Sequence, residues 1–230
     1  MTKRFLTPIS TDHVDFNTTS TSPGGVGRVV WNDGEGTIDV GLKGGNVTLN
    51  VGQEEVALCY NGTGTTLTEG TVVYITGSQG QRPTIQRSSA SSEMGSSKTF
   101  GVVTENILNG EEGFVTTFGL VRGLNTLAYA EGSALWLSAS AGLITTTKPV
   151  APNHGVFIGY CIRSHESSGQ IFVNIQNGYE LEELHNVLIS SPSDGQVLTY
   201  DSVTGLWKNE TSAAAEASQR DWNLSWQPSW

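Results

Sequence analysis

Short runs of β-branched and aromatic residues recur along the chain between Leu67 and Gln176. Runs of about four to eight such residues, closed by Gly, Asn, Pro or Ser, are typical of strands joined by tight turns. In the first run, Val72 and Tyr74 fall on one face and Val73 and Ile75 on the other, because strand side chains alternate. Both faces are largely apolar, so we expect one to meet a core and the other a second sheet or a second subunit.

The turn signals between these runs are regular. We expect reversals at three places: Gly77 to Gly80, Asn109-Gly110 and Ala141-Gly142. Regular turn spacing in a β-rich chain favours a barrel or sandwich over a parallel sheet. The predicted fold class is all-β, with an antiparallel barrel or sandwich over residues 61–178, flanked by an extended N-terminal arm, small β hairpins and a short C-terminal helix or tail. Within the barrel region, residues 88–97 favour a short helix over a loop.

Residues 1–27 predict an extended arm. They sustain neither a helical nor a strand period, and prolines and a Gly-Gly pair interrupt them. The arm is too apolar for a freely solvated tail, so we expect it to anchor the protein on a partner surface or a neighbouring copy. The candidate anchor residues are Phe5, Leu6, Ile9 and Phe16. Asp12, His13 and Asp15 resemble a metal cluster, but no further ligands follow at a recognisable spacing, so we expect no metal site.

Residues 28–60 predict a small β unit of three short strands. The runs are Arg28 to Trp31, Thr37 to Leu42 and Val47 to Val51. Between the first two, Asp33-Gly34 is expected to supply the positive φ that hairpins require. Three such strands cannot bury both faces alone, so we expect the unit to need a helix, another domain or symmetry mates, and interdigitation in a trimer would provide the last of these.

Residues 179–230 predict a C-terminal hairpin module and a tryptophan-rich tail. Two short strands, Gln196 to Tyr200 and Leu206 to Lys208, flank a turn, and the Ala-rich stretch 212–219 favours a helical turn or two. The tail tryptophans are spaced by four, but proline and poor helix formers between them predict an irregular segment. Their indoles either dock on a partner or pack on the protein's own chain. They are Trp222, Trp226 and Trp230.

Composition excludes several classes of function. Twenty-two acidic and twelve basic residues give a formal net charge of -10, which argues against nucleic acid as a partner. No stretch is long and apolar enough to span a membrane, and the start lacks the apolar region of a secretory signal. The two cysteines, Cys59 and Cys161, lie in strand-like runs, and we expect buried reduced thiols, with a disulfide as the alternative.

The sequence does not predict an enzyme, and it calls for no cofactor. It contains no nucleophile elbow, zinc-protease motif or Cys-x-x-Cys pair. Glu111-Glu112 and Glu182-Glu183 are adjacent pairs, whose side chains would point to opposite faces of a strand rather than flank one sugar. Carbohydrate binding stays open, because Trp136, Tyr129 and Trp207 would stack on sugars if they share an open face.

Five segments carry a resemblance to a known family. They are TPISTDHVDF, the run GRVVWNDGEGTIDVGLKGGNVTLNVGQEE, the barrel phrases GVVTENILNGEEGFVTTFGLVRGLNT and APNHGVFIGYCIRS, and the closing ELHNVLISSPSDGQVLTYDSVTGLWKN. The chain resembles structural proteins of tailed bacteriophages, over roughly residues 1–210. Asp194 to Trp207 is similar to a module of phage fibres, and the barrel phrases are similar to capsid decoration proteins. The resemblance implies a trimeric β-rich particle component with one anchoring terminus.

The expected function is therefore a non-enzymatic structural subunit of a virion. The first hypothesis is a short trimeric fibre or fibre adaptor, which fits the absence of a large distal domain after Trp207. The alternatives are a capsid decoration protein that stabilises the head shell and a carbohydrate-binding receptor module. The expected partners are further copies of the chain in a homotrimer, other tail or capsid proteins and, in the third hypothesis, a host surface glycan.

Overall fold

The computed structural model describes residues 12–18 and 25–212, and the chain divides into two compact units, Met1–Gly178 and Tyr179–Trp230. The structure is nearly all β, which confirms the predicted fold class. Three of the candidate anchor residues and the three tail tryptophans lie outside the described residues, as does nearly all of the predicted C-terminal helix. In residues 12–18 of the arm, no strand or helix is present.

A three-stranded antiparallel sheet follows the arm in the first unit. Its strands are β1 (Val29–Asn32), β2 (Thr37–Gly41) and β3 (Thr48–Asn50), in the order β1-β2-β3. The hairpin between β1 and β2 forms as predicted, but Gly34 does not carry the positive φ. Gly36 does, at +66°, because the chain needs its left-handed residue at the end of this loop, where β2 begins.

Five strands close into a small barrel. They are β4 (Glu54–Asn61), β5 (Val72–Gln79), β6 (Arg82–Arg87), β7 (Thr99–Val103) and β8 (Glu112–Leu124). The ring runs β8-β4-β6-β5-β7 and returns to β8, with β4 and β6 parallel and all other neighbours antiparallel. The sequence places most of β4 with the N-terminal hairpins, whereas the structure places it in the barrel, where it pairs with β8 along its whole length.

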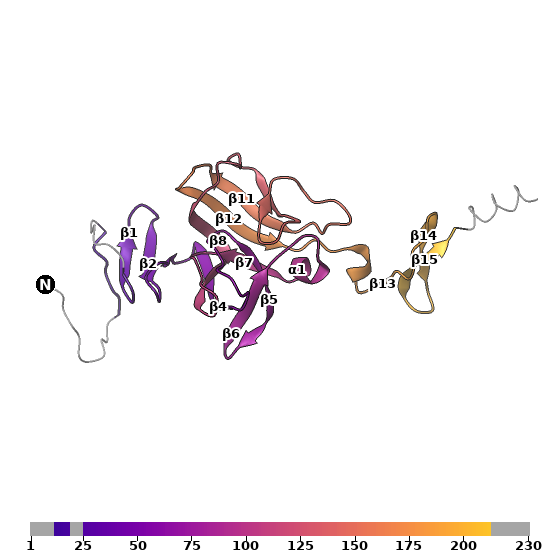
Figure 1. The fold of residues 1–230 in the computed structure, drawn as a ribbon, viewed down its shortest axis with the longest axis horizontal. Helices are drawn as coiled ribbons and strands as arrows, with labels where there is room; N and C mark the ends of the chain where they lie inside the picture. Colours follow the sequence, from indigo (N-terminus) through magenta and orange to yellow (C-terminus); the bar gives the residue numbers. More distant parts are fainter. Residues whose placement is uncertain (1–11, 19–24, 213–230) are drawn as a thin grey trace, which may run out of the picture. The chain divides into compact units, whose positions relative to one another are not determined.

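The barrel extends into a second sheet because β8 is longer than its barrel partners. Beyond the β7 pairing, the same edge of β8 pairs with β12 (Gly169–Gln176). The sheet then continues through β11 (Phe157–Arg163) and β9 (Ala134–Leu137) to β10 (Ile144–Thr145). Figure 1 shows β8, β12 and β11 side by side.

Two hydrophobic cores share the wall made by β5 and β7. Val73 and Val103 belong to the core inside the barrel, together with Cys59, Ile85 and Val115. Their neighbours in sequence, Val72 and Val102, belong to the core under the extended sheet, together with Leu135, Leu137, Ile158, Ile171 and Val173. The expectation that both faces of the first run are buried is therefore confirmed, and alternation along a strand accounts for it.

Gly119 lets β4 approach β8 where β8 passes from one core to the other. Its φ is +97°, and a Cβ at this position would lie 2.2 Å from the carbonyl oxygen of Gln53. Just before it, Thr117 is the extra residue of a β-bulge, because Phe118 pairs with Glu55 and Thr116 with Val56. The bulge and the glycine thus occur together at the junction of the barrel and the extended sheet.

The local elements mostly follow the sequence. The helix expected within residues 88–97 is α1 (Glu93–Ser97), and the Oγ of Ser92 caps it by accepting from the amide of Gly95. The turns at Asn109-Gly110 and Ala141-Gly142 are present. The reversal expected at Gly77 to Gly80 comes later, because β5 continues to Gln79 and pairs there with Arg82, so that only Gly80 and Gln81 form the turn.

The second unit contains another three-stranded sheet. A 3-10 turn, η1 (Leu181–Glu183), precedes β13 (Val187–Leu188), β14 (Gln196–Asp201) and β15 (Leu206–Thr211). The two predicted strands pair in an antiparallel hairpin, and β13 adds to the free edge of β15 in parallel. In this unit, none of the described residues is buried.

Candidate assembly surfaces

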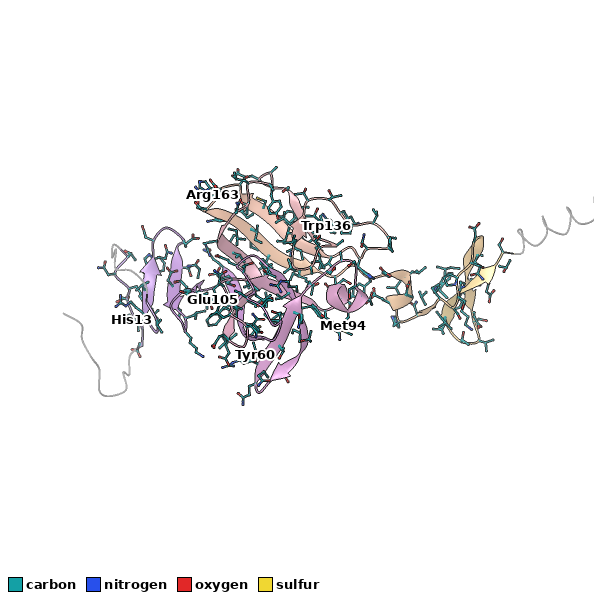
Figure 2. All side chains as sticks on the ribbon, in the orientation of Figure 1. His13, Tyr60, Met94, Glu105, Trp136 and Arg163 are labelled. Atoms are coloured by element: carbon teal, nitrogen blue, oxygen red, sulfur yellow. The ribbon has the colours of Figure 1, made fainter. Side chains whose placement is uncertain are left out.

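The outer face of the extended sheet carries a row of aromatic side chains. Along β12, Ile171 and Val173 point into the core, so Phe172 between them points outward. Along β9, Leu135 and Leu137 are buried and Trp136 lies on the outer face (Figure 2). The outward rings come from four neighbouring strands, and we call them the aromatic stripe: Phe118, Trp136, Phe157, Tyr160 and Phe172.

The rings of the stripe contact one another edge to face. The centroids of Trp136 and Phe157 are 5.4 Å apart, and those of Phe157 and Tyr160 are 5.0 Å apart. Tyr160 is paired across the strands with Phe172, whose ring lies 5.2 Å from that of Phe118. Edge-to-face contacts at these distances are favourable for aromatic pairs, so the stripe is held in a defined arrangement.

Two residues of the stripe are exposed, and the other three are partly covered. Phe118 and Tyr160 are 42% and 45% exposed, and Ile162 beside them is 46% exposed. The ammonium group of Lys148 lies 5.3 Å from the ring centroid of Trp136 and covers that end of the row. An ordered aromatic row that extends across four strands is an apolar patch of the kind that marks interaction sites on soluble proteins.

The N-terminal sheet turns its polar face toward the barrel. Asn32, Asp39 and Asn50 line a cleft of about 370 Å³ together with Glu54 and Arg122 of the barrel. Arg122 Nη1 donates to Glu54 Oε2 at 2.9 Å, and the backbone amide of Asn50 donates to Glu54 Oε1 at 2.8 Å. These bonds satisfy the buried Glu54 carboxylate, whereas Arg122 Nη2 has no hydrogen-bond partner among the described residues and lies 3.8 Å from Glu35 Oε1, so the two sheets meet in an ionic contact at this cleft.

The opposite face of this sheet is apolar and only partly covered. Cross-strand pairing places Val29 with Val40, Trp31 with Ile38, and Val40 with Leu49. Directly paired residues point to the same side of a sheet, so these side chains form one surface. None of them is buried, although Leu42 and Val47 nearby are partly or fully covered. We call this surface the N-terminal apolar face: Val29, Trp31, Ile38, Val40 and Leu49.

The sheet of the second unit has one charged and one uncharged face. Asp201, Lys208 and Glu210 lie on one side, with the exposed Val197 and Leu188. The other side, which we call the C-terminal uncharged face, consists of Val187, Gln196, Leu198, Tyr200, Trp207 and Asn209. On it the rings of Tyr200 and Trp207 lie 5.5 Å apart, and the two residues are 56% and 42% exposed.

Asp201 holds the turn of the C-terminal hairpin. Its carboxylate accepts from Lys208 Nζ, from Thr204 Oγ1 at 2.8 Å and from the amide of Val203 at 2.8 Å. These hydrogen bonds, that of Lys208 above all, lower the pKa of Asp201 well below its usual range. The turn is therefore stabilised by an ionised carboxylate.

The described residues offer little chemistry of other kinds. Both cysteines are free and buried, which confirms the expected reduced thiols, and burial raises the pKa of Cys59 to about 12. His13 and Asp15 form a 3.5 Å ion pair on the surface. Glu112 bridges Lys43 and Arg82 at 3.0 and 3.3 Å, and the hydrogen bond from Lys43 lowers its pKa. These groups stabilise the fold and suggest no reaction.

The structure separates the residues that the sequence grouped as sugar-binding candidates. Tyr129 packs against the core under the extended sheet, and its hydroxyl donates to the carbonyl oxygen of Ile144 at 3.4 Å. Trp136 belongs to the aromatic stripe, and Trp207 to the C-terminal uncharged face in the other unit. They do not form one platform. Phe16, the described anchor candidate, is partly covered, whereas Val14 beside it is 67% exposed.

Sequence reasoning missed the stripe because no strand in it stands out alone. Its residues come from β8, β9, β11 and β12, and only the strand order brings them together. An available signal was the alternation in GQIFVNIQ, where a phenylalanine occupies an outward position between buried aliphatic residues. Aromatic residues at outward positions usually indicate a partner.

Comparison with known proteins identifies no relative. No protein-family model matches the chain, and no curated protein matches it significantly. In the part of the chain that the structure describes, no helix has the length and apolar character needed to cross a membrane.

Proposed function

We propose that the chain is a non-enzymatic structural subunit of a tailed-phage virion, a short homotrimeric fibre or fibre adaptor attached through one terminus. The observation that carries the proposal is the aromatic stripe, five ordered rings on the outer face of the extended sheet. The resemblance of the sequence to phage structural proteins supplies the context. An ordered apolar patch on an all-β subunit is what a protein of this class needs for assembly.

A second copy of the chain is the partner that the stripe suits best. The chain carries a net charge of -10, so copies repel each other, and an uncharged contact surface avoids adding like charges at close range. The five residues of the stripe carry no charge, and aromatic residues are enriched at the centres of protein interfaces. A closed symmetric assembly that places the stripes against neighbouring subunits would cover this surface.

The geometry of the stripe favours a protein partner over a sugar. Sugars stack on the open face of an aromatic ring, whereas the interplanar angles here are 82°, 73° and 68°, so neighbouring rings cover one another's faces with their edges. Lys148 occupies part of the remaining face of Trp136. A glycan platform would need rings that lie more nearly in one plane.

The first test is the mass of the purified full-length chain by sedimentation, together with a stripe variant, Tyr160→Glu and Phe172→Glu. We expect a trimer that dissociates in the variant, because burying carboxylates in the interface is unfavourable. Ser78→Glu and Gln79→Glu, at two exposed positions at the end of β5 and outside the strands of the stripe, provide a charge-matched control, and we expect that variant to remain trimeric. A native chain that stays monomeric at high concentration would contradict the proposal.

The second test locates the protein on particles. A labelled antibody against the chain should mark tail or collar appendages in electron micrographs of phage particles, because the proposal places the subunit there. Uniform labelling of the head shell would instead identify a decoration protein. Particles that lack the chain altogether would overturn the virion role.

A further inference from the structure

The hairpins near the two ends of the chain share one architecture. Asn32 ends the first strand of one hairpin and Asp201 ends the first strand of the other. Each loop ends in a glycine with positive φ, Gly36 at +66° and Gly205 at +72°. The amide of Gly36 donates to the carbonyl oxygen of Asn32 at 2.9 Å, and the amide of Gly205 donates to that of Asp201 at 2.8 Å. The two loops therefore have the same length and the same closing bond.

The side chains at the start of the two loops make equivalent hydrogen bonds. Asn32 Oδ1 accepts from the amide of Glu35 at 3.1 Å, and Asp201 Oδ1 accepts from the amide of Thr204 at 3.3 Å. Each of these two residues also forms a hydrogen bond with the third residue of the second strand. Asn32 Nδ2 donates to Asp39 Oδ2 at 3.0 Å, and Lys208 Nζ donates to Asp201 Oδ2. The direction of the donor is reversed, but the bonded positions correspond.

The strand register is the same in both hairpins. Trp31 pairs with Ile38 at the position where Tyr200 pairs with Trp207. Two residues further from the loop, Val29 pairs with Val40 in the first hairpin, and Leu198 pairs with Asn209 at the equivalent position in the second. Equivalent residues are thus separated by one constant interval along the chain. It follows that the N-terminal apolar face and the C-terminal uncharged face are the same face of one repeated hairpin.

We propose that these two hairpins are copies of one docking module, and that each packs this face against the equivalent face of neighbouring copies of the chain. The inference rests on the proposed homotrimer and adds two contacts to the one made by the aromatic stripe. The occupant is the same hairpin of another subunit, so three copies of each module surround the symmetry axis.

The distribution of charged side chains indicates which face of each hairpin can pack against the same face of another subunit. Equivalent residues approach each other around a symmetry axis, so a charge on the contact face would meet its own kind. The C-terminal uncharged face avoids this, whereas Asp201, Lys208 and Glu210 lie on the other side. In the first module the polar side, with Asn32 and Asp39, already faces the barrel cleft, which leaves the apolar side free.

Burial provides the second argument for a homotypic partner. None of the described residues 179–212 is buried, although they belong to a compact unit, Tyr179–Trp230. Small domains bury little apolar surface and are marginally stable on their own, so association is expected to stabilise this one. A three-stranded sheet likewise needs a covered apolar face, and neighbouring copies of the same sheet would provide one.

Thiol cross-linking of the full-length chain tests the proposal, since the native cysteines are buried. Leu198→Cys places a thiol on the C-terminal uncharged face, and Val197→Cys places one at similar exposure on the opposite face. In the first module, Val29→Cys and Thr48→Cys form the matching pair. With a short bismaleimide, we expect covalent dimers and trimers from Leu198→Cys and Val29→Cys, and at least about tenfold less from the two controls.

A charge placed on the same face completes the test. Adding Trp207→Glu to Leu198→Cys should abolish cross-linking at that module, while sedimentation still reports a trimer held by the aromatic stripe. Equal cross-linking on both faces, or none on either, would overturn the inference. A trimer that labels on particles but fails to cross-link would leave the proposed function standing, so the two failures are distinguishable.

Discussion

At the residue scale, Asp201 shows how one side chain organises a turn. A carboxylate that accepts from Lys208, Thr204 and Val203 holds four positions of the C-terminal hairpin together. Its equivalent, Asn32, is uncharged, and its side-chain amide donates to the Asp39 carboxylate at the position that Lys208 occupies in the other hairpin.

Asp201 makes the C-terminal hairpin sensitive to acid. The hydrogen bond from Lys208 lowers the pKa of Asp201 in the folded chain, whereas the pKa of Asp in an unfolded chain is about 3.9. The stabilisation is therefore complete above that value and is lost as the pH falls toward the folded pKa. Amide exchange in β14 and β15 should lose protection between pH 6 and pH 3, relative to the intrinsic rates.

Asp201→Asn is the matched control for that experiment. The amide oxygen still accepts from Val203, but no charge remains to pair with Lys208. The variant should show lower protection at pH 6 and little further loss at pH 3. Equal protection of the native hairpin at both pH values would contradict the role of the carboxylate.

The two thiols should be inert in the folded chain. Burial raises the pKa of Cys59 to about 12 and also raises the pKa of Cys161, to which the charge of Glu131 contributes. Since the thiolate is the nucleophile, a disulfide reagent at pH 8 should release almost no chromophore from native protein and two equivalents in denaturant. A thiol that reacts within seconds in native protein would show that one core opens readily.

At the element scale, Gly119 is a position where a single added methyl group should be strongly destabilising. Its positive φ and the 2.2 Å approach to the Gln53 carbonyl oxygen leave no room for a side chain. We expect Gly119→Ala to lower the free energy of unfolding by about 3 kcal/mol or more. Urea denaturation followed by circular dichroism measures the change.

Gly77→Ala is the corresponding control. A Cβ at Gly77 would have no heavy atom within 4 Å, and its φ is not in the left-handed region. Its effect should stay within about 1 kcal/mol. If the two variants lose similar stability, close packing at the bulge is not the reason that residue 119 is glycine.

The existence of the strands could be predicted, but their partners could not. Alternation and turn residues located β1, β2, β14 and the start of β15 closely, since both signals are local. The parallel pairing of β4 with β6, and the division of one edge of β8 between β7 and β12, depend on contacts between distant segments. That is why β4 was placed with the wrong unit.

The repeated hairpin was detectable in the sequence and was missed. Its two copies share the glycine that ends the loop, and an Asn or Asp that begins it, but Trp31 corresponds to Tyr200 and Ile38 to Trp207. Residue classes are preserved while identities change. The pairing register reveals the correspondence because it aligns the two loops without reference to side chains.

At the scale of the whole molecule, the arm should be dispensable for folding. In residues 12–18, no strand pairing is present, whereas Val26 bridges to Gly41, so the deletion should end at residue 24. We expect the deleted protein to keep its circular dichroism spectrum and to disappear from particles, because the anchor residues are gone.

A substitution variant controls for the loss of chain length in that experiment. Replacing Phe5, Leu6, Ile9 and Phe16 together by Ser should have the same effect on particle occupancy as the deletion. Normal occupancy of either variant would place the anchor elsewhere, and the tryptophan tail would become the main candidate.

The tail prediction concerns Trp222, Trp226 and Trp230, which lie outside the described residues. If they dock on another virion protein, a small neutral quencher should reach them in the isolated oligomer, and cutting the chain after Glu216 should remove that quenchable fluorescence. If they pack within the oligomer, they should resist quenching in the full-length protein, and the shortened chain should lose a protected part of the fluorescence. A cut that alters neither quenching nor assembly would exclude an interaction site.

The wall of β5 and β7, which the two hydrophobic cores share, affects how the first unit unfolds. Val72 and Val102 support one core while Val73 and Val103 support the other, so neither core can separate from this wall alone without exposing apolar side chains. The unit should therefore behave as a single cooperative foldon. In native-state hydrogen exchange, amides of β5 and β7 should exchange only through global unfolding, at the slowest rates of the chain.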